Sequence, residues 1–417
     1  MTDYGTPFNY YGPTRLVFGR GVTAGAGALV AGLGVRSVLL VCGSGATRRS
    51  AGFAALAAKF EAAGVRATVF DKVTPDPHAA LVAEAADAAR SGSLEAVVAY
   101  GGGSPIDCAK SAALAAANGG PILDYVRGKA TPSRPALPIV AVTTTAGTGS
   151  EMSSAAVTTD LASGQKLGYT NESFFPRIAI VDPENHTSMP TGVTAATGMD
   201  ALTHAVEAYY CLAKNPLSDG AALAAVRLVG EHLLRVTRDP SDRNGRLAMA
   251  TAALLAGAAF SNSMVGMVHT MGHATGSVCG VAHGVCMAIY LPYGLEYNLH
   301  KRGETMAELL LPLAGEEVYR GTPPVERARR MIAEVRKLNA DLHEATGGRH
   351  ARFLSEVRDR EGRPMVTREQ IPEIARAALN DGSIFYNPEE MDFDDLRMVI
   401  FAAWTGEPLD ASRIRKG

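Results

Sequence analysis

Hydrophobic and polar positions follow two different patterns along the 417 residues of this chain. Between Arg15 and Asp182, short apolar runs alternate with stretches in which apolar residues recur at helical spacing. Such alternation predicts strands and helices in turn, and indicates a mostly parallel sheet that helices cover on both faces. The predicted strands are 15–18, 37–42, 66–70, 94–100, 138–143, 155–160 and 177–182; the predicted helices between them are 47–63, 78–90 and 105–117.

From about Pro190 onward the helical spacing continues and strand-like runs almost vanish. The clearest predicted helices are 219–236, 246–261, 324–345 and 392–404. A chain of this length is too long for one compact core, and VDPENHTSMPT places two prolines between the two patterns. We therefore expect an α/β domain over residues 1–185 and an all-α domain over residues 186–417.

The stretch GMVHTMGHATGSVCGVAHG in the helical half holds three of the ten histidines of the chain. His269 and His273 are four residues apart and share one helix face, and His283 follows after a Gly-containing break. Asp200 and His204, in GMDALTHAVEAYY, form a second pair at the same spacing. Imidazole and carboxylate ligands suit Fe²⁺, Zn²⁺ or another divalent first-row metal. Spacing alone leaves open which histidines are ligands, and each one taken singly also fits an ordinary core position.

A glycine-rich loop follows the predicted strand 94–100, in LEAVVAYGGGSPIDCAK. Gly102 and Gly103 allow a tight turn and close approach of a ligand. Ser104 is positioned to cap the next helix, with Pro105 at its first turn and Asp107 completing a capping box. The N-terminus of a helix attracts anions, so a pyrophosphate fits here, although the same pattern also occurs in plain strand-to-helix connections.

A second loop, TTTAGTGSEMSS (residues 143–154), follows the predicted strand 138–143 and is rich in hydroxyls. Two such loops at the carboxyl ends of parallel strands are where open α/β sheets bind nucleotides. An ordinary connection with hydroxyl caps is the alternative interpretation of this second loop.

The usual dinucleotide fingerprint is not met after the predicted strand 37–42. There the chain reads Gly43-Ser44-Gly45-Ala46-Thr47-Arg48, so Arg48 stands where the third glycine belongs. No acidic residue stands at this strand end to hold a ribose 2′-hydroxyl, and Arg48 and Arg49 would accommodate a 2′-phosphate. This feature favours NADP(H) over NAD(H).

Composition narrows the classes of partner. A formal net charge of −2 gives no reason to expect nucleic acid or an anionic membrane as partner. The first residues lack the pattern of a signal peptide, and no later run is long and apolar enough for a membrane span. Five cysteines without a CxxC pair fit reduced thiols, so we expect a cytoplasmic protein.

With GGGSPID, TTTAGTGSE, GMDALTHAVEAYY and VHTMGHATGSVCGVAHGV in this order, the sequence resembles the iron-containing (group III) alcohol dehydrogenase family over essentially its whole length. The resemblance implies a dinucleotide-binding α/β domain followed by a helical metal-binding domain, with the active site in the cleft between them. It also implies hydride transfer between NAD(P)(H) and a small primary alcohol or aldehyde, with Fe²⁺ as the foremost metal and Zn²⁺ as another.

The resemblance assigns roles residue by residue. Its metal ligands would be Asp200, His204, His269 and His283, and His273 would be the catalytic histidine beside the nicotinamide. Many members carry Asp where this chain has Gly43, which leaves the preference between NAD and NADP open. The remaining cofactor contacts would be Gly102, Gly103, Ser104, Asp107, Thr144, Thr145, Thr148, Ser153 and Lys166.

Related functions on the same scaffold are the nearest alternatives. Glycerol dehydrogenase-like proteins use fewer ligands, maleylacetate reductase-like proteins lack the aspartate ligand, and dehydroquinate synthase-like proteins catalyse a cyclisation. The complete set of one Asp and three His favours an alcohol dehydrogenase. A non-catalytic sensor of dinucleotide or metal is a further alternative. The family resemblance also implies a homodimer or a larger homo-oligomer.

Overall fold

The computed structural model describes residues 7–414 and divides into two compact units. The first unit is Gly12–Ser188, and the second is Met189–Gly417 together with the residues up to Tyr11. The first unit combines strands and helices, and the second is helical. The predicted fold class, an α/β domain with a mostly parallel sheet followed by an all-α region, is confirmed.

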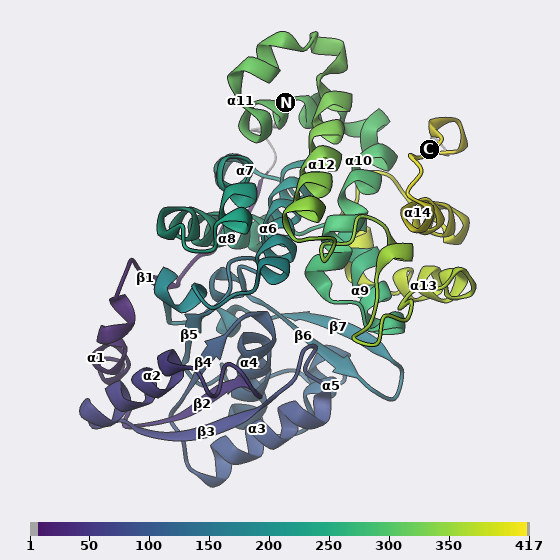
Figure 1. Cartoon of the computed structure of the whole chain (residues 1–417). Helices are drawn as coiled ribbons and strands as arrows, with labels where there is room; N and C mark the ends of the chain where they lie inside the picture. Colours follow the sequence, from purple (N-terminus) through teal and green to yellow (C-terminus); the bar gives the residue numbers. More distant parts are fainter. Residues whose placement is uncertain (1–6, 415–417) are drawn as a thin grey trace. The chain divides into compact units, whose positions relative to one another are not determined.

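The first unit is built on a six-stranded sheet in the order β1-β8-β5-β4-β2-β3, in which all neighbouring strands are parallel (Figure 1). Its strands are β1 (Arg15–Phe18), β2 (Ser37–Gly43), β3 (Arg66–Val73), β4 (Ala96–Gly101), β5 (Ile139–Thr143) and β8 (Ile178–Val181). The predicted strand 155–160 forms, but as β6 (Ala155–Asp160) it pairs antiparallel with β7 (Gln165–Thr170) outside this sheet. The strand β7 was not predicted.

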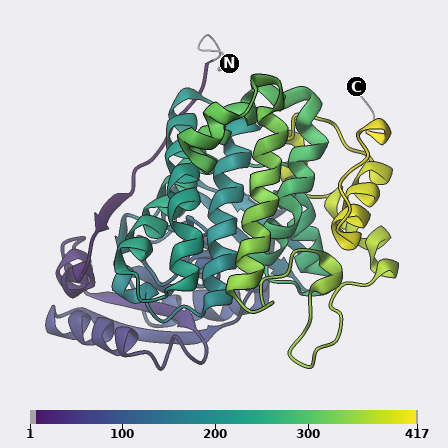
Figure 2. The ribbon, with the colours of Figure 1, turned by 45° about the horizontal axis from the view of Figure 1, so that its top comes forward.

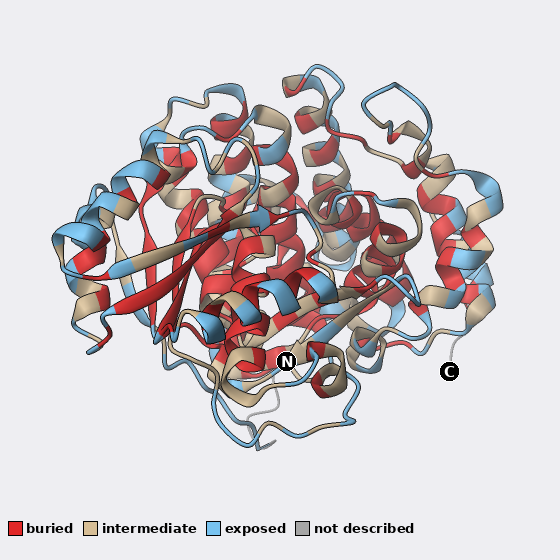
Figure 3. Cartoon of the chain, turned by 90° about the horizontal axis from the view of Figure 1, so that it is seen from below, coloured by how far each residue is buried: buried red, intermediate tan, exposed pale blue. Residues whose placement is uncertain are grey.

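Alternate side chains of the central strands enter two separate cores. Leu39, Val97 and Ala141 point to one face of the sheet, and Leu40, Val98 and Val140 point to the other. Buried strand residues are accordingly red in Figure 3, as expected for a parallel sheet covered on both sides. Helices α3 (Ala79–Ser91), α4 (Gly103–Asn118) and α5 (Ile122–Val126) cover the first face; α1 (Ala26–Ala31) and α2 (Ala51–Ala62) cover the second.

The predicted capping box at the start of α4 is wrong. The helix begins at Gly103 with Gly102 as its N-cap, and no side chain caps it. The Ser104 hydroxyl instead accepts a hydrogen bond from the backbone N–H of Asp76 at 3.3 Å. The Asp107 carboxylate accepts from the backbone N–H of Val157 in β6 at 3.2 Å, so both side chains bind backbone groups outside α4.

The second unit consists of helices that stand side by side, visible in teal and green in Figure 2. Helix α6 lies at the centre of this packing and contacts α7, α8 and α10, while α12 packs against α10. The helices are α6 (Thr191–Tyr210), α7 (Pro216–Arg238), α8 (Arg243–Ser263), α9 (Met267–Cys279), α10 (His283–Glu308), α11 (Leu310–Gly321), α12 (Arg327–Ala345), α13 (Ile371–Ala378) and α14 (Phe393–Thr405).

A sharp turn between α8 and α9 redirects the chain by 103°. Met264 adopts a φ of 69° there, which is uncommon for a residue with a side chain, and Gly266 is the N-cap of α9. A Cβ at Gly266 would lie 2.9 Å from the side chain of Asn387, so glycine suits this position. In the described residues no single helix passes a length and hydropathy test for spanning a membrane; α8 and α9 pass it only as a bent pair.

Candidate active site

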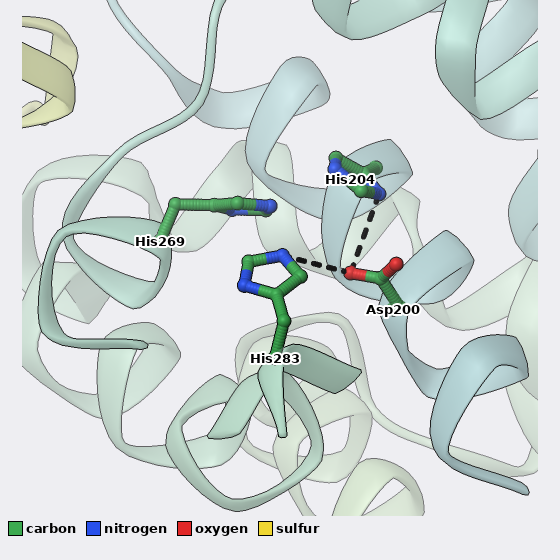
Figure 4. A group of neighbouring side chains, drawn as sticks. All are labelled: Asp200, His204, His269 and His283. Carbon is green, nitrogen blue, oxygen red and sulfur yellow. Dashed lines mark ion pairs between the residues drawn. The ribbon is translucent and has the colours of Figure 1, made fainter. Parts of the chain in front are cut away.

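Three helices of the second unit bring one carboxylate and three imidazoles together (Figure 4). Helix α6 supplies Asp200 and His204 from one face, because residues four apart lie one turn above each other. Helix α9 supplies His269 from its first turn, and α10 begins with His283. Asp200, His204 and His269 are buried, whereas the His283 side chain keeps 27% of its surface exposed. One side of the cluster therefore remains accessible.

The distances suit a single small cation. One potential ligand atom from each of the four residues lies within 4.8 Å of all the others. Asp200 Oδ1 lies 3.6 Å from His204 Nδ1 and 3.3 Å from His283 Nε2, as the dashed lines of Figure 4 mark. The ring centroids of His204 and His269 are 4.5 Å apart. A cation with bonds of about 2 Å to each donor would fit between atoms spaced in this way.

The electrostatics of the cluster also suit a cation. Burial lowers the pKa of His204 to about 3 and that of His269 well below its usual range, so both rings are neutral and keep a lone pair. Burial opposes ionisation of Asp200, but the neighbouring imidazoles, His204 foremost, lower its pKa below the ordinary value. Within the described residues, Asp200 Oδ1, His204 Nδ1 and His269 Nε2 are buried without a hydrogen-bond partner. A metal ion would satisfy all three atoms.

His273 lies beside this group without belonging to it. Its ring stacks on that of His283, with centroids 5.2 Å apart and planes 19° from parallel. Its Nδ1 lies 2.8 Å from Oδ2 of Asp381, which directly precedes a short 3-10 helix, η8 (Gly382–Tyr386). Phe260 of α8 stacks on His204, with ring centroids 4.4 Å apart. The metal-ligand set predicted from the family resemblance thus clusters as four residues, with His273 at its edge.

A buried carboxylate that was not predicted from the sequence contacts the ring of His269 at Nδ1. Glu207 of α6 is fully buried, and its Oε2 lies 2.5 Å from His269 Nδ1. Burial raises the pKa of Glu207 to about 7, against the hydrogen bonds that it accepts from the backbone. Its position in the sequence was a usable signal: three residues after His204 and seven after Asp200, it extends the same helix face.

Three of the residues predicted to bind a cofactor lie at the carboxyl ends of adjacent strands of the first unit. Gly43 ends β2, Gly102 follows β4, and Thr144 follows β5. The chain order reverses between β2 and β4, because β3 lies on one side of β2 and every later strand of this sheet lies on the other. Open parallel sheets bind nucleotides in the crevice at such a switch point.

The two predicted cofactor loops pack directly on each other. A Cβ on Gly102 would lie 2.7 Å from the Thr145 hydroxyl, and one on Gly103 would lie 2.9 Å from a methyl carbon of Thr148. Contacts this short leave no room for a side chain, so both glycines are required for the approach of the second loop. No side chain caps the N-terminus of α4, and an uncapped helix N-terminus generally attracts anions.

A buried lysine ties α4 to the chain that follows the threonine loop. Lys110 is fully buried, and its Nζ donates hydrogen bonds to the carbonyl oxygens of Ser150 (2.7 Å), Ser153 (2.8 Å) and Ala155 (2.8 Å). It also lies 3.1 Å from the Ser153 hydroxyl. Burial lowers the pKa of Lys110 to about 8 and raises that of Asp107, one turn earlier, to about 6. Lys110 was not among the residues singled out in the sequence.

Other residues predicted as cofactor contacts are engaged with protein groups. Ser153 is buried against Lys110, and Ser104 binds the backbone of Asp76. Lys166 Nζ lies 2.8 Å from the carboxylate of Asp76, and its side chain is only 4% exposed. Asp76 itself has a φ of 55° in the loop before α3 and joins two predicted contact residues, yet no sequence motif pointed to it. Roles for these residues toward a cofactor stay predictions.

Comparison with known proteins places the chain among alcohol dehydrogenases. A family model described as iron-containing alcohol dehydrogenase matches residues 13–183, and the C-terminal model of the Fe-containing alcohol dehydrogenase family matches residues 194–404. The NAD-dependent methanol dehydrogenase of Bacillus methanolicus is 36% identical over 393 residues, which cover 94% of this chain and 98% of that protein. The 1,3-propanediol dehydrogenase of Klebsiella pneumoniae is 34% identical, with 95% and 99% covered. A crystal structure of a 1,3-propanediol oxidoreductase matches with a TM-score of 0.87 and 32% identity, covering 96% of this chain and 100% of that one.

Proposed function

Because this chain belongs to the iron-containing alcohol dehydrogenase family, we propose that it is a metal-dependent oxidoreductase that transfers a hydride between NAD(P)(H) and a small primary alcohol or aldehyde. The observation that carries this proposal is the group of Asp200 and three imidazoles, whose potential ligand atoms all lie within 4.8 Å of one another. The relatives named for methanol and 1,3-propanediol support a small alcohol as the substrate.

The donor set determines which metals are suitable. One carboxylate oxygen and three neutral imidazole nitrogens suit a divalent first-row ion, with Fe²⁺ foremost from the family and Zn²⁺ as an alternative. When bound, such an ion supplies Lewis-acid polarisation of the substrate oxygen, and the nicotinamide supplies or accepts the hydride.

The chain's own residues would perform the remaining tasks. The glycine loop and the start of α4 would bind the pyrophosphate through backbone N–H groups. His273, with Nδ1 on Asp381, would exchange the alcohol proton through Nε2. Phe260 would cover one face of the His204 ring, on which it stacks.

We also propose that the enzyme prefers NADP(H), that it is located in the cytoplasm and that it forms a homodimer or larger homo-oligomer. Gly43 places no carboxylate at the end of β2, and Arg48 pairs with the half-exposed Asp71 at 3.1 Å. An exposed pair of this kind is weak, so a 2′-phosphate could compete for Arg48. All five cysteines are free thiols, which suits a reducing compartment. The oligomer rests on the family alone.

The test combines metal analysis of the purified protein with oxidation of NADH and NADPH against a panel of short aldehydes, followed by the absorbance of reduced nicotinamide. We expect one divalent metal per chain and aldehyde-dependent oxidation. His269→Ala and His283→Ala should each lose both metal and turnover. His232→Ala, which changes a histidine of α7 outside the cluster, should keep both.

Two results would contradict the proposal. A His283 variant with full activity and no metal would remove the metal from the reaction. Cofactor binding without oxidation by any aldehyde or alcohol would favour a non-catalytic sensor of dinucleotide or metal instead.

A further inference from the structure

Glu207 occupies a position from which one carboxylate reaches two different parts of α9. It lies on the face of α6 that also carries Asp200 and His204. Its Oε1 accepts hydrogen bonds from the backbone N–H of Val268 at 2.8 Å and from the Tyr210 hydroxyl at 3.2 Å. Its Oε2 contacts the ring Nδ1 of His269 at 2.5 Å and the backbone N–H of His269 at 3.4 Å.

These contacts favour one nitrogen of His269 as the position of its proton. A neutral imidazole has one N–H and one lone pair, and a carboxylate that already accepts from backbone N–H groups calls for the N–H at Nδ1. The lone pair is then on Nε2. That atom is buried, has no hydrogen-bond partner among the described residues and belongs to the cluster with Asp200.

We propose that Glu207 is a positioning residue for the metal site, which fixes the tautomer and the ring orientation of His269 so that Nε2 is presented as a ligand. The inference rests on the proposed function, since it concerns the same cluster. A carboxylate that accepts a hydrogen bond from the ring nitrogen of a ligand histidine that does not bind the metal typically raises metal affinity by about 10- to 100-fold. The effect is thermodynamic and precedes any reaction.

A purely structural role is the alternative, because Glu207 also binds backbone N–H groups at the N-terminus of α9. Glu207→Gln separates the two roles. Its amide oxygen can still accept from Val268, but its NH₂ group would face His269 Nδ1 and turn that nitrogen into an acceptor. The proton of His269 would move to Nε2 and block the ligand position.

A matched control exists elsewhere in the second unit. Glu389 is also a buried glutamate, 2% exposed, and it pairs with His300 and with Lys301. Glu389→Gln therefore perturbs a pair between a buried glutamate and a partly exposed histidine, and neither residue belongs to the cluster. Any loss of affinity in Glu207→Gln beyond that of Glu389→Gln reports the contact with His269.

The experiment titrates Zn²⁺ into the metal-free full-length protein in competition with a chromophoric chelator, and records the visible spectrum of the Co²⁺ form. We expect Glu207→Gln to bind Zn²⁺ about 10- to 100-fold more weakly than the wild type and to alter the Co²⁺ spectrum. Glu389→Gln should match the wild type. Affinity for Zn²⁺ within twofold of the wild type would overturn the inference.

Two further outcomes keep the result interpretable. If the wild type binds neither Zn²⁺ nor Co²⁺, the proposed function itself fails. If Glu207→Gln does not fold, ¹⁵N NMR of histidine-labelled metal-free wild type, assigned with His269→Asn, reads the tautomer directly. A proton on Nδ1 supports the inference and a proton on Nε2 overturns it.

Discussion

Nδ1 of His273 lies 2.8 Å from Oδ2 of Asp381, a residue 108 positions further along the chain. The Asp381 side chain is 11% exposed, and although burial opposes its ionisation, the adjacent His273 lowers its pKa. An ionised Asp381 keeps the ring proton of His273 on Nδ1 and leaves Nε2 as the basic nitrogen. The pair has the form of a proton-transfer group with its own orienting carboxylate.

Asp381→Asn should lower kcat without loss of metal. Asparagine is as good a helix N-cap as aspartate, so the hydrogen bond from the backbone N–H of Ser383 should survive. The orienting charge on His273 is lost, and we expect kcat to fall about tenfold, against about 100-fold for His273→Ala. Steady-state rates and metal content of both variants check this. An unchanged kcat in Asp381→Asn would mean that the pair is only structural.

Lys110→Met should weaken both the fold of the first unit and cofactor binding. The substitution fits the volume but leaves the carbonyl oxygens of Ser150, Ser153 and Ala155 without this donor. Each buried unsatisfied group costs about 1–3 kcal/mol, so we expect a clear fall in melting temperature. The KM for the cofactor should rise more than kcat falls, because α4 and the threonine loop separate.

The control for that variant is Lys72→Met. Lys72 forms an exposed pair with Glu84, and its side chain is 64% exposed, so its loss should leave the melting temperature close to that of the wild type. Equal cofactor KM values for Lys110→Met and the wild type would refute the positioning role of Lys110.

The sequence predicted what local patterns encode. The strands β2, β4 and β5 were recognisable because buried parallel strands need continuous apolar runs. The Asp200–His204 pair was recognisable because residues four apart in a helix lie on the same face. The family resemblance separated the ligand His283 from the neighbouring His273, which spacing alone did not achieve.

The features that the sequence did not predict depend on contacts between distant segments. Asp381 and Lys110 act on groups 108 and at least 40 positions away, and no local motif marks them. Ser104 fits a capping box by sequence, but α4 begins one residue earlier, at Gly103, and the Ser104 hydroxyl binds the backbone of Asp76. The strand β7 has few apolar residues and forms because it pairs with β6.

His350 should make the helical unit less stable in acid. It is 2% exposed, and burial lowers its pKa from 6.5 to about 4. Its Nε2 contacts Asn339 Oδ1 at 3.0 Å, which suits a neutral ring. Because the folded-state pKa lies below the unfolded value, this stabilisation is complete above pH 6.5 and is lost as the pH falls toward 4. Between pH 7 and pH 5 the loss is about 2 kcal/mol.

The measurement is the melting temperature of the wild type and His350→Gln from pH 7 to pH 5. Glutamine cannot take up a proton, so the difference between the two proteins isolates the titration of His350 from that of the cluster histidines. We expect the advantage of the wild type to shrink as the pH falls. Parallel pH profiles would show that the imidazole of His350 does not titrate in this range.

Cofactor choice should depend on the ion pair between Arg48 and Asp71. Arg48 Nε lies 3.1 Å from Asp71 Oδ2, and its guanidinium lies 4.7 Å from the centre of the Phe53 ring. Removing Arg48 should lower the ratio of kcat/KM for NADPH to that for NADH about tenfold, since one charge-assisted hydrogen bond to a 2′-phosphate is lost. Asp71→Asn should raise that ratio because it frees Arg48, and Gly43→Asp should lower it by charge repulsion.

The measurement is the initial rate of each variant with NADPH and with NADH. Arg66→Ala, which changes an exposed arginine at the start of β3, is the control. If the ratio is the same in Arg48→Ala, Asp71→Asn and the wild type, Arg48 plays no part in choosing the cofactor and the expected preference for NADP(H) loses its basis.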